Sequence, residues 1–271
     1  MRSFVVVLGA LGALASFAGV AAQVSTPDAD WKVWGGPDRN FITPSTGLFT
    51  GPEKWIANPP KRLWERPLGD GYSAIAVEGD RLYTGFRRGS SDVFVALDAA
   101  TGKTIWEFNY PAPFTNAYAA AVGPGPFAMP QVVGDRIVTA SAIGQIHSLD
   151  KKTGAQVWSL DLYKQFGGTR LDFGYSSHAL PYRDSLIILA GGRGSAVLRV
   201  RQTDGTPVWR AQNLTSAHSS PVLIDVDGQP QVAILLADEV VGIDPETGDL
   251  LWRHPHRTDN GLHLVRTKVL R

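Results

Sequence analysis

The chain has 271 residues, of which 44% are hydrophobic, and its formal net charge is +1 at pH 7. It contains no cysteine, which excludes disulfides, thiolate metal sites, cysteine nucleophiles and a lipid anchor attached to an N-terminal cysteine. No basic stripe accompanies the near-neutral charge, so we expect no nucleic-acid partner. The length, together with 29 glycines and 18 prolines, fits one large β domain with many short strands and tight turns.

Residues 1–22 have the pattern of a secretory signal peptide. A short positive end at Arg2 precedes an apolar run over residues 4–20, and Ala21 and Ala22 provide small residues for cleavage. An uncleaved membrane anchor is the alternative, although the apolar run is close to the minimum length for a span. The signal predicts a periplasmic or extracellular protein with no membrane span after cleavage.

Residues 23–62 are rich in Pro, Gly, Asn and Trp and show no sustained periodicity. We interpret them as an extended leader that packs on the domain. Their most pointed part runs from Trp31 to Asn40, where alternating apolar residues lead into a Gly-Gly-Pro turn. An edge strand that buries Trp31 and Trp34 is favoured there over a ligand site.

An eleven-residue phrase occurs four times in the rest of the chain, and each copy ends in tryptophan. The copies are 96–106, 148–158, 199–209 and 242–252. Their spacing of about 40 to 50 residues is typical of four-stranded propeller blades. We therefore predict an all-β propeller over 63–261, with four-stranded antiparallel blades near 63–108, 127–160, 175–211 and 217–254.

Turn formation and packing explain the residues of the phrase. Asp can bond the backbone two residues on, and Gly accepts the left-handed conformation that closes the hairpin. The tryptophan lies on the outer strand, where an indole can cover the junction with the neighbouring blade. The predicted docking residues are Asp98, Gly102, Trp106, Asp150, Gly154, Trp158, Gly205, Trp209, Asp244, Gly248 and Trp252. The third copy has Arg199 and Arg201 in the small-residue and Asp positions, which predicts looser docking at that junction.

The phrase resembles the tryptophan-docking motif of pyrroloquinoline quinone (PQQ) repeat propellers. The segments 34–40 and 68–73 are similar to those of bacterial secreted members of that group, which also includes quinoprotein alcohol dehydrogenases and the propeller lipoprotein of the outer-membrane assembly machinery. The resemblance implies seven or eight blades, so we expect an incomplete ring and a truncated chain, with an aberrant tail at 262–271. Open blade faces predict self-association, for example of two four-blade halves.

The resemblance leaves the chemistry open. A PQQ enzyme needs a flat anionic quinone, a calcium ion on oxygen ligands and an aspartate base. The vicinal cysteine pair of quinoprotein alcohol dehydrogenases cannot exist here, and no calcium ligand set maps onto the chain, so we assign no catalytic residue and no metal site. We expect a non-catalytic binding or assembly scaffold. The alternatives are a fragment of a PQQ-dependent alcohol or sugar dehydrogenase and a gene remnant without function.

Polar residues begin the first strand of several blades and give the candidate ligand contacts of the channel face. They are Ser73, Ser177, His178, His218 and Ser219. A structural role, in which these groups bond one another or water, is favoured over ligand binding. Insertions at 109–129 and 163–174 should emerge on one face of the propeller. We expect a protein or small-molecule partner at that face.

Overall fold

The computed structural model describes residues 30–43, 45, 52–57, 59–115 and 123–257. The predicted signal peptide at 1–22 and the predicted tail at 262–271 lie outside these ranges. Within the described part of the chain, no helix is long and apolar enough to cross a membrane.

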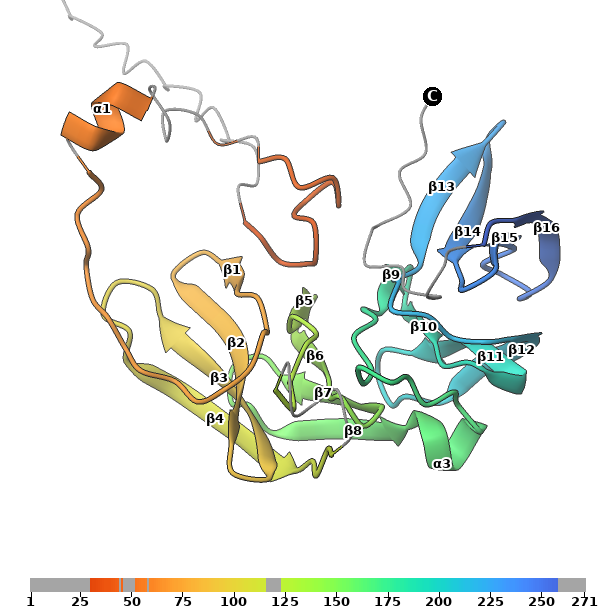
Figure 1. The fold of residues 1–271 in the computed structure, drawn as a ribbon, viewed down its shortest axis with the longest axis horizontal. Coiled ribbons are helices and arrows are strands. Elements are labelled where there is room, and N and C mark those ends of the chain that lie inside the picture. The colour runs from red at the N-terminus through yellow and green to blue at the C-terminus, as the bar shows by residue number, and fades with distance from the viewer. Residues whose placement is uncertain (1–29, 44, 46–51, 58, 116–122, 258–271) are drawn as a thin grey trace, which may run out of the picture.

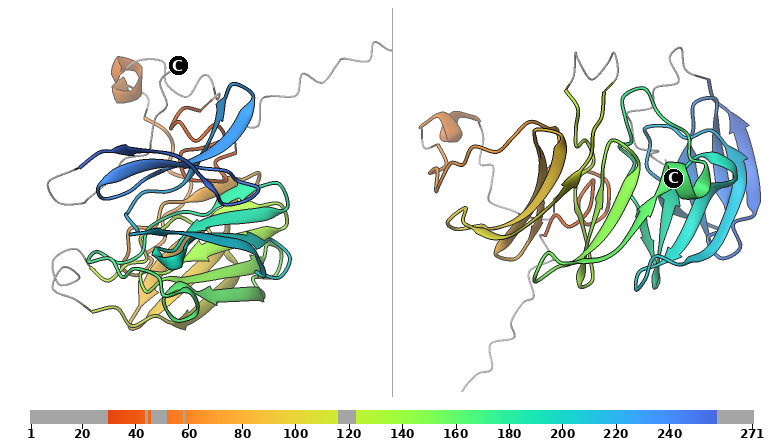
Figure 2. Two further views of the ribbon diagram at one scale, coloured as in Figure 1. Left: turned by 90° about the vertical axis from the view of Figure 1, so that its right-hand side faces the viewer. Right: turned by 90° about the horizontal axis from the view of Figure 1, so that it is seen from below.

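Four antiparallel sheets of four strands follow one another along the chain, as the repeats predict (Figure 1). The strands are β1 (Ala76–Glu78), β2 (Arg81–Arg88), β3 (Ser91–Asp98) and β4 (Thr104–Pro111) in blade 1; β5 (Gln131–Val133), β6 (Arg136–Ala140), β7 (Gln145–Asp150) and β8 (Gln156–Asp161) in blade 2; β9 (Leu180–Tyr182), β10 (Ser185–Leu189), β11 (Gly192–Arg201) and β12 (Pro207–Leu214) in blade 3; and β13 (Val222–Val226), β14 (Gln229–Leu235), β15 (Glu239–Ile243) and β16 (Leu250–Pro255) in blade 4. The blades form an arc that does not close into a ring (Figure 1), and Figure 2 shows the same sheets from two other sides. The predicted all-β propeller fold is confirmed.

Two short helices in the described part of the chain were not predicted. They are α1 (Pro52–Ala57) in the leader and α3 (Leu162–Phe166) after β8. The side chain of Asp161 caps α3 by accepting a hydrogen bond from the Lys164 amide, and Gly167 ends it in the left-handed conformation. A helix of five residues is too short to show a periodic apolar pattern, which is why the sequence indicated only an insertion there.

Each outer strand has a bulge at the same place in the repeat. In blade 1 the register passes from Ala96 opposite Trp106 to Leu97 opposite Thr104, so Ile105 has no partner. The other blades skip the equivalent residue, which is Val157, Val208 or Leu251. A bulge bends its strand and redirects the next side chain. The bulged residue is exposed, and the tryptophan beside it turns toward the neighbouring blade.

The tryptophans join consecutive parts of the chain in one repeated way. Each indole N–H donates to the carbonyl of a turn in the next blade: Trp64 to Ala99 (2.8 Å), Trp106 to Lys151 (3.0 Å), Trp158 to Gln202 (2.8 Å) and Trp209 to Pro245 (3.2 Å). Each ring also lies over the glycine of that turn, in the order Gly102, Gly154, Gly205 and Gly248, where an added Cβ would approach the ring to 2.6–2.9 Å. Because no larger residue leaves that space, glycine is required at these positions for packing as well as for its positive φ.

The aspartate of the phrase shapes the turn that receives the indole. Asp98 accepts hydrogen bonds from the amide (2.8 Å) and the hydroxyl (2.6 Å) of Thr101, and these bonds, the hydroxyl first, lower the pKa of its carboxyl. Asp150 makes the same pair of bonds to Thr153. In blade 4 Asp244 accepts from the Glu246 amide (2.7 Å). The carbonyls that receive the indoles are thereby held in fixed directions.

Trp252 departs from this pattern. Its indole N–H donates to the Gln231 side chain of its own blade (2.6 Å), and its ring lies over Gly242, where an added Cβ would clash at 2.1 Å. Among the described residues, Trp64, Trp106, Trp158 and Trp209 each bind a turn of the following blade. Trp252 contacts only its own blade in this way.

The junction between blades 3 and 4 is reinforced by charge. Arg199 is buried and places Nη1 2.6 Å from Glu246 Oε2 and 3.2 Å from the Pro245 carbonyl oxygen. Tyr182 donates its hydroxyl to the same carboxylate (2.8 Å), and the Arg199 guanidinium lies over the Tyr182 ring. Trp209 is only half-buried here, and its indole bond is the longest of the four. At this junction an ion pair therefore provides part of the stabilisation that tryptophan packing provides at the other junctions.

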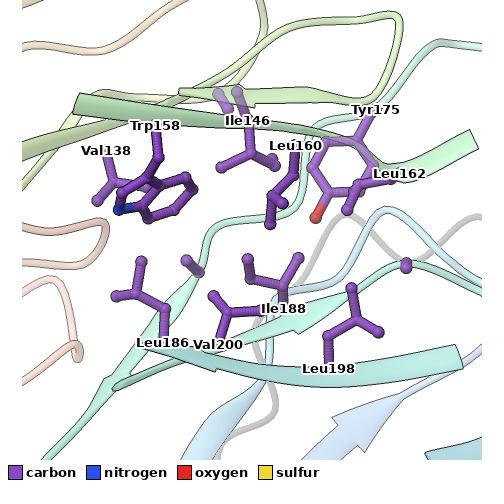
Figure 3. Packing of buried hydrophobic residues seen from close by; sticks show 14 of the residues in the cluster. Val138, Ile146, Trp158, Leu160, Leu162, Tyr175, Leu186, Ile188, Leu198 and Val200 are labelled. Atoms are coloured by element: carbon purple, nitrogen blue, oxygen red, sulfur yellow. The ribbon is translucent and has the colours of Figure 1, made fainter. Parts of the chain in front are cut away.

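The hydrophobic core lies between blades, in separate layers. Figure 3 shows the layer between blades 2 and 3, where Trp158 and Leu160 face Leu186 and Val200. Similar layers lie between blades 1 and 2 and between blades 3 and 4. Burying one large apolar side chain contributes about 1.5–3 kcal/mol, so each blade depends on its neighbours for stability.

Substitution of Gly154 tests the indole contact. Gly154 (φ 73°) and Gly134 (φ 59°) both lie in the left-handed region, where alanine costs about 1–2 kcal/mol. Only at Gly154 would the new Cβ meet the Trp106 ring, at 2.6 Å, because nothing lies within 4 Å at Gly134. We expect Gly154→Ala to lower the free energy of unfolding by about 1–3 kcal/mol more than Gly134→Ala, measured by urea denaturation. Equal losses would show that the indole contact contributes nothing.

Candidate functional site

Residues 30–43 of the leader lie on the inner side of the arc, next to the first strands of the blades, whereas α1 lies away from it (Figure 1). Trp31 forms a β-bridge with Val77, whose amide donates to the Trp31 carbonyl (3.0 Å). The next carbonyl, that of Lys32, accepts from the Val132 amide of β5 (2.8 Å). The leader therefore links the innermost strands of blades 1 and 2. Trp31 and Trp34 are half-buried there, but the predicted edge strand is reduced to the isolated bridge at Trp31, and Trp34 lies in a turn.

Trp34 covers the predicted ligand residue His178. The two rings stack at a centroid distance of 5.1 Å with an interplanar angle of 5°. His178 Nε2 accepts from the Met129 amide (3.0 Å), so the ring proton is on Nδ1, which donates to Ser220 Oγ (3.1 Å). Both ring nitrogens are used within the protein. His178 is therefore a structural residue that connects the leader with blades 2, 3 and 4.

Burial keeps His178 neutral. It lowers the pKa of the imidazole to about 3, and the positive charge of Arg39 adds to the effect. A protonated ring would have to reverse the hydrogen bond from the Met129 amide, which is fixed as a donor. Protonation of His178 thus opposes the native arrangement.

His218, the second candidate histidine, is half-buried. Its Nδ1 lies 3.1 Å from Ser176 Oγ, and Phe173 packs against the ring edge. Burial lowers its pKa, while Asp172 acts in the opposite direction. Ser176 with His218 and His178 with Ser220 are equivalent positions of neighbouring blades. These polar residues therefore pair laterally between blades 3 and 4.

The three candidate serines are not brought together. Ser73 Oγ accepts from the Gly85 amide (3.2 Å), and Ser219 Oγ donates to the Leu235 carbonyl, each within its own blade. Ser177 is fully buried, and its hydroxyl makes no hydrogen bond with the described residues. The structural role favoured for these residues is consistent with this arrangement.

The inner side of the arc does not fit a PQQ group with calcium. Trp34 occupies the ring face of His178, and the histidine nitrogens are already bonded. Within the described ranges, no three His, Cys, Asp or Glu side chains lie close enough to hold a metal ion. A flat tricarboxylate and its calcium would need both an open aromatic face and a group of oxygen ligands.

A buried ion pair between β2 and β3 of blade 1, covered by the insertion that follows β4, was not foreseen. Arg87 and Asp92 form an ion pair at 2.9 Å with both side chains almost fully buried, and Arg87 also donates to the carbonyls of Gly89, Ala112 and Pro124. Burial outweighs the attraction of Arg87 and raises the pKa of Asp92 to about 7. The pair fixes the start of the insertion that follows β4. In the sequence, a buried Arg–Asp pair cannot be distinguished from charges in an exposed hairpin loop. The only indication of burial was that Arg87 follows a run of strand residues.

A pocket of about 290 Å³ lies where the two insertions meet the turn between β6 and β7. Its lining residues are Pro113, Phe114, Thr115, Ala142, Ile143, Tyr163, Arg170, Leu171 and Asp172. The predicted insertions, 109–129 and 163–174, contain most of these residues, but none of them was predicted individually to contact a ligand. Aromatic and charged residues in an insertion were the available signal.

Comparison with known proteins gives the family. The sequence model described as "Outer membrane protein assembly factor BamB" matches residues 49–132 and 119–268. A BamB of Shewanella oneidensis is 22% identical over 221 residues, covering 74% of this chain and 51% of the relative. A BamB of Burkholderia pseudomallei is 28% identical over 129 residues, covering 47% and 30%. The chain thus spans about half the length, or less, of these curated relatives.

A solved structure shows the same fold. It is a europium-containing methanol dehydrogenase, which superposes with a TM-score of 0.54 at 16% identity and covers 74% of this chain and 46% of that one. At this identity the likeness concerns the arrangement of the blades alone.

Protonation of His178 should be visible in the pH dependence of stability. Because the native pKa is lowered to about 3, stability is complete above the unfolded value near 6.5 and falls as the pH drops, by up to about 1.4 kcal/mol per unit. We expect the free energy of unfolding, measured by urea titration between pH 6.5 and 4.5, to fall less steeply in His178→Asn than in the wild type. His254→Asn, on the exposed part of β16, should keep the wild-type slope. An unchanged slope in His178→Asn would contradict the assignment.

Proposed function

Since the chain belongs to the PQQ-like repeat β-propeller family, with a match to the BamB family model over most of its length, we propose that it is a non-catalytic scaffold of the bacterial envelope. In this role it binds another protein and supports assembly at the outer membrane. The support comes from two relatives whose names describe outer-membrane protein assembly factors. Both are distant, so the role rests equally on the geometry of the site.

The observation that carries the proposal is the contact between Trp34 and His178. The chain's own leader takes the aromatic face that a flat cofactor would need, and the hydrogen bonds of His178 are complete without a ligand. A structural role therefore fits the inner side of the arc better than redox chemistry does.

An envelope location is part of the proposal. The N-terminal pattern of a signal peptide directs a protein out of the cytoplasm, and a chain without cysteine cannot carry a lipid on an N-terminal cysteine. We place the mature protein in the periplasm. The partner would then meet the face formed by the two insertions, where the pocket lies.

Cofactor titration and gene deletion together test this role. Addition of PQQ and Ca²⁺ should leave the tryptophan fluorescence unchanged and give no dye-linked oxidation of alcohols or sugars. Deletion of the gene in its host should lower the amount of folded outer-membrane proteins. Tight PQQ binding with turnover would favour the alternative, a fragment of a quinoprotein dehydrogenase, and would overturn the proposal.

Self-association through the open blade faces is a separate prediction. The turn of blade 1 already receives Trp64, so Trp252 of a second copy can reach Gly102 only after Trp64 leaves. We expect Trp64→Ala to increase the dimer fraction in light scattering after gel filtration. The double variant with Trp252→Ala should return to the wild-type mass. No change of mass in Trp64→Ala would exclude this contact.

A further inference from the structure

The pocket between the insertions is a built feature of the fold. Gly144 has no side chain, so the Tyr163 ring lies where a Cβ would approach it to 2.8 Å. Gly174 also has no Cβ, and Phe114 and Ala142 lie within about 3 Å of the position that its Cβ would take. Backbone bonds hold the floor: the Tyr175 amide donates to the Ala142 carbonyl (2.8 Å), and the Leu162 amide to Gly144 (3.0 Å). These contacts make the pocket wall rigid.

The wall is apolar on one side and charged at the rim. Phe114, Ile143 and Leu171 give apolar surface, and Tyr163 adds an aromatic face. The exposed Arg170 guanidinium lies 4.7 Å above the Tyr163 ring. The carboxylate of Asp172 lies on the same rim, so the pocket carries one charge of each sign. The Arg170 guanidinium, held over the Tyr163 ring, has five N–H donors and can bind a planar anion through those that the ring leaves open.

Size limits the ligand. A volume of about 290 Å³ is at the low end for small-molecule sites, so it suits one side chain with its backbone and not a dinucleotide or a tricyclic cofactor. The apolar wall favours an aromatic or branched aliphatic side chain. The guanidinium favours a carboxylate next to that side chain.

We propose that this pocket binds a peptide segment in which an aromatic or branched aliphatic side chain stands beside a carboxylate, with the side chain against Phe114 and Leu171 and the carboxylate on Arg170. The carboxylate belongs either to an acidic residue or to a chain end, and the recognition chemistry is the same. This inference rests on the proposed function, because it names the kind of partner that the scaffold would bind at this face.

The test uses two small probes that differ only in charge. N-acetylphenylalanine carries the side chain and the carboxylate, and N-acetylphenylalaninamide carries the side chain alone. Titration of the whole chain, followed by amide chemical shifts, should show the acid binding about three- to tenfold more tightly than the amide, with shifts at Ala142 and Leu171. Screening at an exposed arginine keeps this ratio moderate.

Two variants test whether the Arg170 side chain causes the tighter binding of the acid. Arg170→Gln should reduce the acid-to-amide ratio to about one, while its exposed position leaves the thermal unfolding midpoint unchanged. Lys164→Gln is the matched control, since it removes a charge from α3 without removing a lining residue and should keep the wild-type ratio. N-acetylalanine, which lacks the large side chain, should bind more weakly than N-acetylphenylalanine.

Three results would overturn the proposal: equal binding of acid and amide by the wild type, no binding of either probe, or an unchanged ratio in Arg170→Gln. A preference for a phenylalanine-ended peptide over an internal Phe-Glu peptide would identify the carboxylate as a chain end, and the reverse order as an acidic side chain. Failure of the scaffold role shows instead as PQQ turnover or as normal outer-membrane assembly after gene deletion. The two failures are therefore read from different measurements.

Discussion

One contact determines the architecture: in blades 1 to 3 the indole of the outer strand lies over a glycine in the next blade and donates its N–H to a carbonyl of the same turn. The contact joins a hydrophobic ring, a backbone hydrogen bond and a turn that tolerates no Cβ. It fixes both the distance and the angle between blades, and the core layers then fill the space that it defines. Where Arg199 replaces a small residue, an ion pair to Glu246 restores the junction by different chemistry.

The inner side of the arc follows from how the leader is held. Backbone bonds connect it to blades 1 and 2, and the Trp34 stack reaches His178 in blade 3. On the inner side, one face of the His178 ring is therefore covered by Trp34 of the same chain. Recognition is left to the insertions, where a rigid apolar wall meets the Arg170 guanidinium. The inner side and the loop face thus have separate roles, one in holding blades together and one in contacting a partner.

Sequence reasoning identified the blades because Asp, Gly and Trp recur in a fixed register, and local turn chemistry dictates those residue types. It predicted an edge strand at Trp31 and Trp34, where the structure has an isolated bridge at Trp31 and a turn at Trp34. It did not foresee that Trp34 would cover His178, because these residues are far apart in the chain. Arg87 and Asp92 face each other across the β2–β3 hairpin, but their burial depends on a distant segment, the insertion that covers them with the carbonyls of Ala112 and Pro124. The pocket was missed for the same reason: Phe114 and Arg170 lie in different insertions, and neither has a repeat to indicate its partner.

The leader's contacts also set an order of events in folding. Blade-to-blade contacts involve neighbours in sequence and can form one after another as the chain leaves the ribosome or the translocation channel. Trp34 is made early, but its partner His178 belongs to blade 3, and the acceptor Ser220 belongs to the segment that starts blade 4. The leader must therefore wait until most of the propeller has been synthesised. The segment around Trp34, although it is synthesised first among the described residues, is therefore among the last to reach its native position. Its docking requires that blades 1 to 3 and the start of blade 4 have already formed.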